Sequence, residues 1–196
     1  MELPSLPYPA PSTSDLYERL EASNIRLDKA WAGVKEVLAI HLPGMVDTYN
    51  TKNNRLGDDA LVCPIDYYTG GESLQDREFP VIVVGGEMEF APLGVNAFLG
   101  TVNSCIWVLT RANTSRNDIH DSSTLAHLAW GVMLGFCGGY FNSVGQMLWG
   151  SLQPHAVRAI PKNEKSIYGG FFVALDIQQG PNDNAASLYA TAPPPP

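Results

Sequence analysis

The chain has 196 residues, of which 45% are hydrophobic and 16% are charged, and its formal net charge is −8. These values predict one domain with a sizeable core and a sparsely charged surface, which favours a subunit of an assembly over a free monomer. The acidic balance argues against a protein that grips nucleic acid by neutralising phosphates. The absence of an apolar run of ~18 residues argues against a membrane span.

Both ends of the chain are rich in proline. Residues 1–14 carry Pro4, Pro7, Pro9 and Pro11, and residues 181–196 end in four consecutive prolines. Such spacing favours an extended, polyproline-like chain outside a packed core. We therefore expect an N-terminal arm over residues 1–14, a single domain over 15–180 and a C-terminal arm over 181–196. The arms either are disordered or lie on a neighbouring subunit. Because residues 1–11 lack the basic and apolar regions of a signal peptide, we expect a soluble protein made inside the cell.

The first predicted helix starts at Ser14-Asp15. Its apolar face is marked by Leu27, Trp31, Val34 and Leu38, which are spaced by four, three and four residues. Pro43-Gly44 is expected to stop this helix. We expect loops over residues 47–59 and 66–78, with a short strand over 60–65 between them.

The middle of the chain predicts strands. Phe79-Pro80 opens a short buried strand that Gly85-Gly86 is expected to break, and residues 87–98 should hold a turn and a return. Residues 100–110 form the clearest strand, because apolar side chains occur on both of its faces. The doublets Gly85-Gly86 and Gly169-Gly170 are best explained by bulges or by close approach of two backbones.

A second helix is expected to begin at Asp121 or Ser122 and to end at Gly138-Gly139. Residues 141–149 are interpreted as a short helix or an apolar loop, and residues 152–160 and 168–178 as a hairpin. The order helix, strands, helix, strands predicts an α+β fold. Its sheet is mostly antiparallel, with two main helices packed on one face and proline-rich extended termini.

The last strand has no obvious water-facing side. Phe171, Val173, Leu175 and Ile177 alternate on one face, yet Phe172 and Ala174 make the opposite face apolar too. The helices can cover only one face, so we expect another subunit on the second. The candidate interface residues are Phe172, Ala174, Asp176, Arg158 and Trp107. We expect Asp176 either to pair with Arg158, across strands or between subunits, or to face water near the strand end.

The sequence offers little for catalysis. It has no phosphate-binding glycine loop and no nucleophile elbow, and its three cysteines form no CxxC pair. Cys105 with His127 as its base is the best catalytic pair, but a thiol in the middle of an apolar strand should be inert. We therefore expect no catalytic residue, no metal and no cofactor. A small-molecule-binding domain with a pocket near Trp107, His127 and Trp130 remains an alternative.

With its elements in this order, the chain resembles the tail-terminator and tail-completion proteins of bacteriophages. The resemblance starts with a leading helix and with the strand Phe79-Pro80-Val81-Ile82-Val83-Val84. A long strand over 101–110, a polar segment over 111–121, a helix over 122–136 and an alternating final strand over 168–178 follow. It covers roughly residues 15–178. The chain departs from the family in its proline-rich ends and in its longer loops at 47–59 and 66–78.

The resemblance implies a structural virion protein of the phage tail or neck, assembled in the host cytoplasm. The family forms a six-fold ring that caps the tail tube, stops its polymerisation and presents a docking face to the head-side connector. Its partners would be copies of itself, the tail tube protein, the connector or adaptor, and the sheath protein if the tail is contractile. DNA would pass only as cargo, which suits an acidic chain.

Four basic residues fall in predicted loops and are candidates for docking loops: Arg111, Arg116, Lys162 and Lys165. Ordinary polar loop tips are the simpler explanation of these residues. Two further functions stay open beside the terminator and the small-molecule-binding domain. One is another head-tail neck adaptor, and the other is a module whose proline-rich arms enter a partner's groove.

Overall fold

The computed structural model describes residues 14, 26–70, 72–74, 77–92, 98–111, 116–141, 147–160 and 168–179. The predicted arms therefore lie almost wholly outside the described residues. Helix α2 spans Leu27–Lys52, the short 3-10 helix η1 spans Gly57–Asp59, and helix α3 spans Arg116–Leu134. The strands are β1 (Tyr67–Thr69), β2 (Val81–Pro92), β3 (Phe98–Arg111), β4 (Tyr140–Phe141), β5 (Met147–Trp149), β6 (Ser151–Ala159) and β7 (Tyr168–Gln179).

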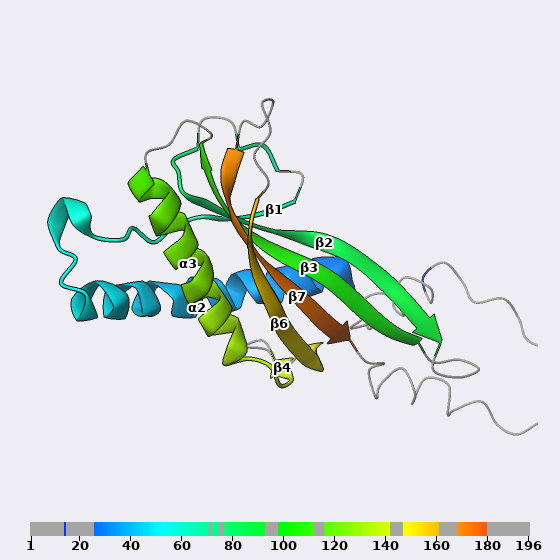
Figure 1. The fold of residues 1–196 in the computed structure, drawn as a ribbon. Helices are drawn as coiled ribbons and strands as arrows, with labels where there is room; N and C mark the ends of the chain where they lie inside the picture. Colours follow the sequence, from blue (N-terminus) through cyan, green and yellow to red (C-terminus); the bar gives the residue numbers. More distant parts are fainter. Residues whose placement is uncertain are drawn as a thin grey trace, which may run out of the picture.

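The main sheet has five strands in the order β1-β2-β3-β7-β6 (Figure 1). Strand β1 runs parallel to β2, and the other neighbouring pairs are antiparallel. Both helices contribute to one buried cluster with the same face of the sheet, whereas no helical residue belongs to the small cluster on the opposite face. The predicted α+β fold, with a mostly antiparallel sheet and two helices on one face, is confirmed.

Helix α2 runs straight through the predicted stop at Pro43-Gly44, so that prediction is wrong. The apolar stripe continues on both sides of the proline, because Leu42 and Val46 are buried in the core. Pro43 itself is exposed, so its ring projects into solvent. Burial of the stripe outweighs the backbone hydrogen bond that a proline removes. Residues 47–52, expected to be loop, are the last turns of this helix.

The strand expected over residues 60–65 is also absent from the structure. Leu61 is buried, but both of its backbone polar groups bind one side chain, that of Asn50 on α2. The Asn50 Nδ2 donates to the Leu61 carbonyl at 2.9 Å, and the Leu61 N–H donates to Asn50 Oδ1 at 2.9 Å. The amide thus satisfies the groups that a neighbouring strand would bind. A three-residue strand, β1, forms instead inside the segment predicted to be a loop.

Two glycines let the neighbours of β3 approach it closely. A Cβ on Gly86 would lie 2.2 Å from the carbonyl oxygen of Asn103, and one on Gly170 would lie 2.0 Å from that of Val108. Both glycines have positive φ, which L side chains rarely adopt. Close backbone approach, one of the two explanations offered for the doublets, is confirmed. The expected break at Gly85-Gly86 is wrong, since β2 continues to Pro92.

Helix α3 begins before the predicted cap. It starts at Arg116, so Asp121 and Ser122 lie inside it. The Asp121 carboxylate accepts two hydrogen bonds from Arg55, at 2.8 and 3.3 Å, which tie the segment after α2 to α3. The Ser122 hydroxyl donates to the Ile119 carbonyl at 2.9 Å. Asp121, which the sequence suggested as a helix cap, therefore binds Arg55, a residue distant in the sequence.

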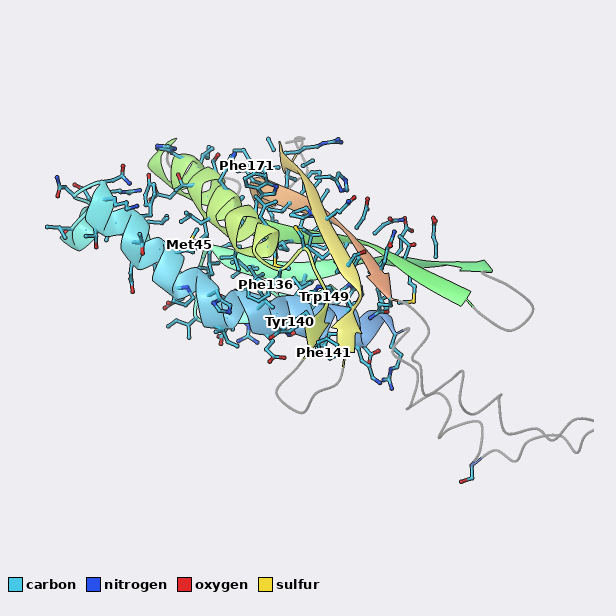
Figure 2. The ribbon with its side chains drawn as sticks, turned by 90° about the horizontal axis from the view of Figure 1, so that it is seen from below. Met45, Phe136, Tyr140, Phe141, Trp149 and Phe171 are labelled. Carbon is cyan, nitrogen blue, oxygen red and sulfur yellow. The ribbon has the colours of Figure 1, made fainter. Side chains whose placement is uncertain are left out.

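The C-terminal end of α3 rests on an aromatic group. The helix ends at Leu134, and the Trp149 indole N–H donates to the carbonyls of Phe136 and Gly138 at 3.2 and 3.1 Å. Tyr140 stacks on Trp149 with ring centroids 4.8 Å apart, and these side chains gather beside α2 (Figure 2). The segment predicted as a short helix or apolar loop contributes the small β4–β5 sheet.

Two glycines of α2 provide a matched test of this packing. Gly44 is exposed and a Cβ there would meet nothing within 4 Å, so Gly44→Ala should raise the free energy of unfolding by roughly 0.5–1 kcal/mol. A Cβ on Gly33 would lie 2.7 Å from Trp149 Cζ3, so Gly33→Ala should lower it by about 1–3 kcal/mol. Urea denaturation measures both. Equal effects of the two substitutions would contradict the packing of α2 on β5.

Candidate interaction face

The side of the sheet opposite the helices, here called the open face, is built in cross-strand rows. Trp107 pairs in register with Phe172, which pairs with Arg158. The next row joins Cys105, Ala174 and Ala156, and the third joins Asn103, Asp176 and Gln153. Side chains alternate along each strand, so these rows face away from the buried residues Val102, Ile106, Val173 and Leu175.

The end of the open face nearest β1 is covered by the chain itself. Tyr68, Val81 and Val83 are buried there, and Leu74, Phe79, Trp107 and Leu109 pack against them. The segment that precedes β2 thus shelters the β1–β2 end. The expectation that the chain had nothing left to cover its second face is wrong for this end of the sheet.

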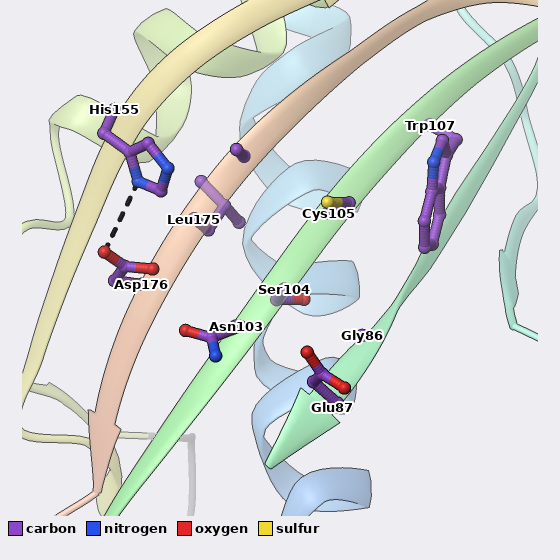
Figure 3. Close-up of a pocket in the computed structure, with 10 residues that line it drawn as sticks. Gly86, Glu87, Asn103, Ser104, Cys105, Trp107, His155, Leu175 and Asp176 are labelled. Atoms are coloured by element: carbon purple, nitrogen blue, oxygen red, sulfur yellow. Dashed lines mark ion pairs between the residues drawn. The ribbon is translucent and has the colours of Figure 1, made fainter. Parts of the chain in front are cut away.

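The rest of the open face is hollowed. A depression of about 570 Å³ lies over β2, β3, β7 and β6, with Cys105 on its floor (Figure 3). Ala174, the partner of Cys105 in the register, also lines it. Trp107 forms one wall because Gly85 makes room for its ring: a Cβ there would lie 2.7 Å from Trp107 Cζ3. Polar side chains form the rim, namely Glu87, Asn103, His155 and Asp176. Apolar floor and polar rim together have the composition of an interaction site.

Within one chain, Asp176 and Arg158 do not form the cross-strand pair, and their pairing between subunits stays a prediction. In the register Asp176 lies opposite Gln153, whereas Arg158 lies opposite Phe172 and is exposed. A register shift between Pro154 and Ala156 leaves His155 outside the regular pairing, and its Nδ1 lies 3.5 Å from Asp176 Oδ2. Both side chains are nearly half exposed, so a bond between them contributes little to stability.

The structure brings the predicted interface residues together on the open face, although Asp176 and Arg158 do not pair within one chain. Trp107, Phe172, Ala174 and Asp176 are all partly buried on the open face. Sequence reasoning missed Glu87, Asn103 and His155. Asn103 could have been found, because it alternates with Cys105 and Trp107 along its strand. The position of His155 depends on a bulge, and only Pro154 in the sequence marked one.

Two of the four basic docking candidates belong to described elements. Arg111 is the last residue of β3 and Arg116 the first of α3, while Lys162 and Lys165 fall between β6 and β7 in the sequence, outside the described residues. Arg111 pairs with Tyr168, so β3 ends and β7 begins at the same end of the sheet. The structure does not describe the side chains of Arg111 and Arg116.

The structure separates the residues of the catalytic alternatives. Cys105 faces the open side of the sheet, whereas His127 lies on α3, behind the other face, and its Nδ1 is 2.7 Å from the Ser123 carbonyl oxygen. Trp130 packs into the helix-side core, so it shares no pocket with Trp107. Within the described ranges, no three His, Cys, Asp or Glu side chains gather as a metal site would require.

Neither α2 nor α3 is both long enough and apolar enough to cross a membrane.

The Cys105 thiol should behave as a poor nucleophile. Burial raises its pKa above the ordinary value, so less thiolate is present at a given pH. In a chain carrying Cys63→Ser and Cys137→Ser, the midpoint of the pH dependence of alkylation by iodoacetamide should lie higher for the folded protein than for the same chain in urea. A midpoint at or below that of the unfolded chain would show an activated cysteine instead.

No protein-family model matches this sequence, and a search of curated proteins found no similar sequence. Function must therefore be inferred from the geometry of the open face and from the resemblance in element order.

Proposed function

We propose that this chain is a structural virion protein, a tail terminator whose copies form a ring, hexameric as in the family it resembles, at the end of a phage tail tube. The observation that carries the proposal is the open face. It presents Phe172, Ala174, Cys105 and Trp107 on a sheet whose helices lie on the other side.

The chemistry of this face suits contact between proteins. Aromatic and small apolar side chains occupy its centre, and the polar side chains of Glu87, His155 and Asp176 lie at the rim. Apolar centres with polar rims are typical of protein interfaces. Covering the face with a second copy removes apolar surface from water at about 25 cal/mol per Å².

A closed ring requires two different patches on each subunit, because head-to-tail contacts never match a patch with itself. The open face supplies one such patch. It is continuous with β6, the last strand of the sheet, so a neighbour seated on this face also reaches a sheet edge. The net charge of −8 supports a ring through which DNA passes without being held.

The partners follow from this position in the particle. They are the tail tube protein below the ring, the head-side connector or adaptor above it, and the sheath protein where the tail contracts. DNA passes the lumen as cargo. The same open face would serve another head-tail neck adaptor, and the particle experiment below separates the two functions.

Adjacent phenylalanines on β7 give a matched test of assembly. Phe172 lies on the open face, so Phe172→Asp should leave a folded subunit that no longer assembles. Phe171 packs against the helix-side core, so Phe171→Asp should lower the free energy of unfolding by about 3 kcal/mol or more. Circular dichroism and light scattering measure folding and assembly. Global unfolding of the Phe172 variant would show that the residue is ordinary core, and full assembly would exclude this face from the interface.

The role in the particle is tested by removing the protein from an infection. Micrographs should show tails longer than normal, because nothing stops tube polymerisation. Full heads without tails would instead indicate a neck adaptor. Particles of normal shape in normal number would overturn both assembly functions.

A further inference from the structure

A second concave surface lies at the covered end of the open face and is not needed for the ring. This groove, here called the Tyr68 groove, has a volume of about 320 Å³. Its lining includes Val62, Cys63, Ile65, Tyr68, Arg77 and Phe79. It shares no lining residue with the hollow around Cys105.

The aromatic rings of this groove are held in place before any ligand arrives. Tyr68 is only 7% exposed, and the Arg77 guanidinium lies over its ring, 5.1 Å from the centroid. The Tyr68 hydroxyl donates to Asp66 at 3.3 Å. Phe79 stacks on Tyr168 with ring centroids 5.7 Å apart. Fixed rings reduce the entropy that a ligand must overcome on binding.

The rim of the groove faces water and combines exposed apolar residues with the charged residues Asp66, Arg77 and Glu78. Ile65 is 94% exposed and Val62 is 66% exposed, although Leu61 beside them is buried. A fixed aromatic lining with apolar residues at its edge is the type of surface that binds proline-rich segments in polyproline conformation. Such a segment binds at a small entropic cost because its backbone is already extended.

The chain carries such a segment. Residues 3–9 are Leu-Pro-Ser-Leu-Pro-Tyr-Pro, in which the Leu-Pro pair repeats after three residues. A polyproline helix has three residues per turn, so Leu3 and Leu6 fall on one side of it and Pro4 and Pro7 on the next. We propose that residues 3–9 of this chain bind in the Tyr68 groove.

The span agrees with this assignment. The described domain begins at Arg26, whose backbone N–H donates to Gln179 Oε1 at 2.9 Å. Gln179 pairs with Gly100 of β3, whereas Val81, which lines the groove, pairs with Leu109 of the same strand. Gly100 and Leu109 are nine residues apart, or about 30 Å along a strand. Residues 10–25 span up to about 50 Å when fully extended, and about 30 Å with the helix that the sequence predicts from Ser14 onward. The segment therefore reaches the groove of its own copy, and in an assembly it reaches that of a neighbour.

Cys63 provides a native reporter at the edge of the groove, because it is half-buried and is one of the lining residues, with its sulfur 3.8 Å from the Tyr67 hydroxyl. The test uses the full chain with Cys105→Ser, Cys137→Ser and Leu6→Cys. Copper-phenanthroline serves as the oxidant that accepts the two electrons of disulfide formation. A docked segment should form the bond to Cys63 on the order of tenfold faster than tethering alone allows. The matched control is Ser12→Cys in place of Leu6→Cys, on the same arm but outside the repeat.

Mass spectrometry of the non-reduced digest identifies the bond. A band of monomer size places the segment in its own copy, and a band of dimer size places it in a neighbour; either supports the proposal. Adding Pro4→Ser and Pro7→Ser should reduce the rate to that of the Ser12 control. Equal rates at positions 6 and 12, or no effect of the prolines, would overturn it.

A second measurement does not depend on the new cysteine. In the chain with Cys63 as its single cysteine, Pro4→Ser with Pro7→Ser should speed the reaction of Cys63 with a bulky maleimide several-fold, while the thermal melt by circular dichroism stays unchanged. An unchanged rate would mean that the groove is empty or is filled by something other than residues 3–9. The result stands apart from the Phe172 test, since the groove lies outside the proposed ring contact.

Discussion

The one-sided placement of the helices on a five-stranded sheet is the constraint from which the other features follow. Strands β3 and β7 lie in the middle of the sheet and are apolar on both faces, so the side without helices must be sheltered in some other way. The chain does this with its own segment at the β1–β2 end and leaves the centre hollow. The hollow and the Tyr68 groove thus both lie on the face that the helices do not cover, where the chain's own segments shelter only part of the sheet.

Glycine positions shape this layer as much as its side chains do. Gly86 and Gly170 let β2 and β7 approach the backbone of β3 closely, and Gly85 leaves space for the Trp107 ring. With a larger residue at position 85 the ring would be displaced toward the depression, since a Cβ there would lie 2.7 Å from it. The depth of the hollow therefore depends first on the missing side chain at position 85 and then on the residues that line it.

Alternation along the strands predicted which residues of 102–109 and 171–177 share a face, because each side chain's environment in a strand is set by a period of two. Phe171 and Phe172 fell on the faces assigned to them. Local sequence signals gave wrong predictions where residues distant in the sequence make the stabilising contacts. Pro43 did not stop α2, because core residues on both sides of it stabilise the helix. The Asn50 side chain binds the Leu61 backbone in place of a neighbouring strand. The Asp121 carboxylate binds Arg55 and does not cap its own helix. In the candidate site, the partner of Asp176 was missed because a bulge shifts the register at His155.

The buried side chain of Gln179 has a consequence for how this domain is connected. Its Oε1 accepts from the Arg26 backbone, and its Nε2 donates to the Leu148 carbonyl at 2.8 Å, so one amide fastens the entry and the exit of the domain to the same corner. A polypeptide whose ends meet in this way can be spliced as a unit into a surface loop of an unrelated host protein. A circularly permuted version joined through that corner would keep every strand pairing intact.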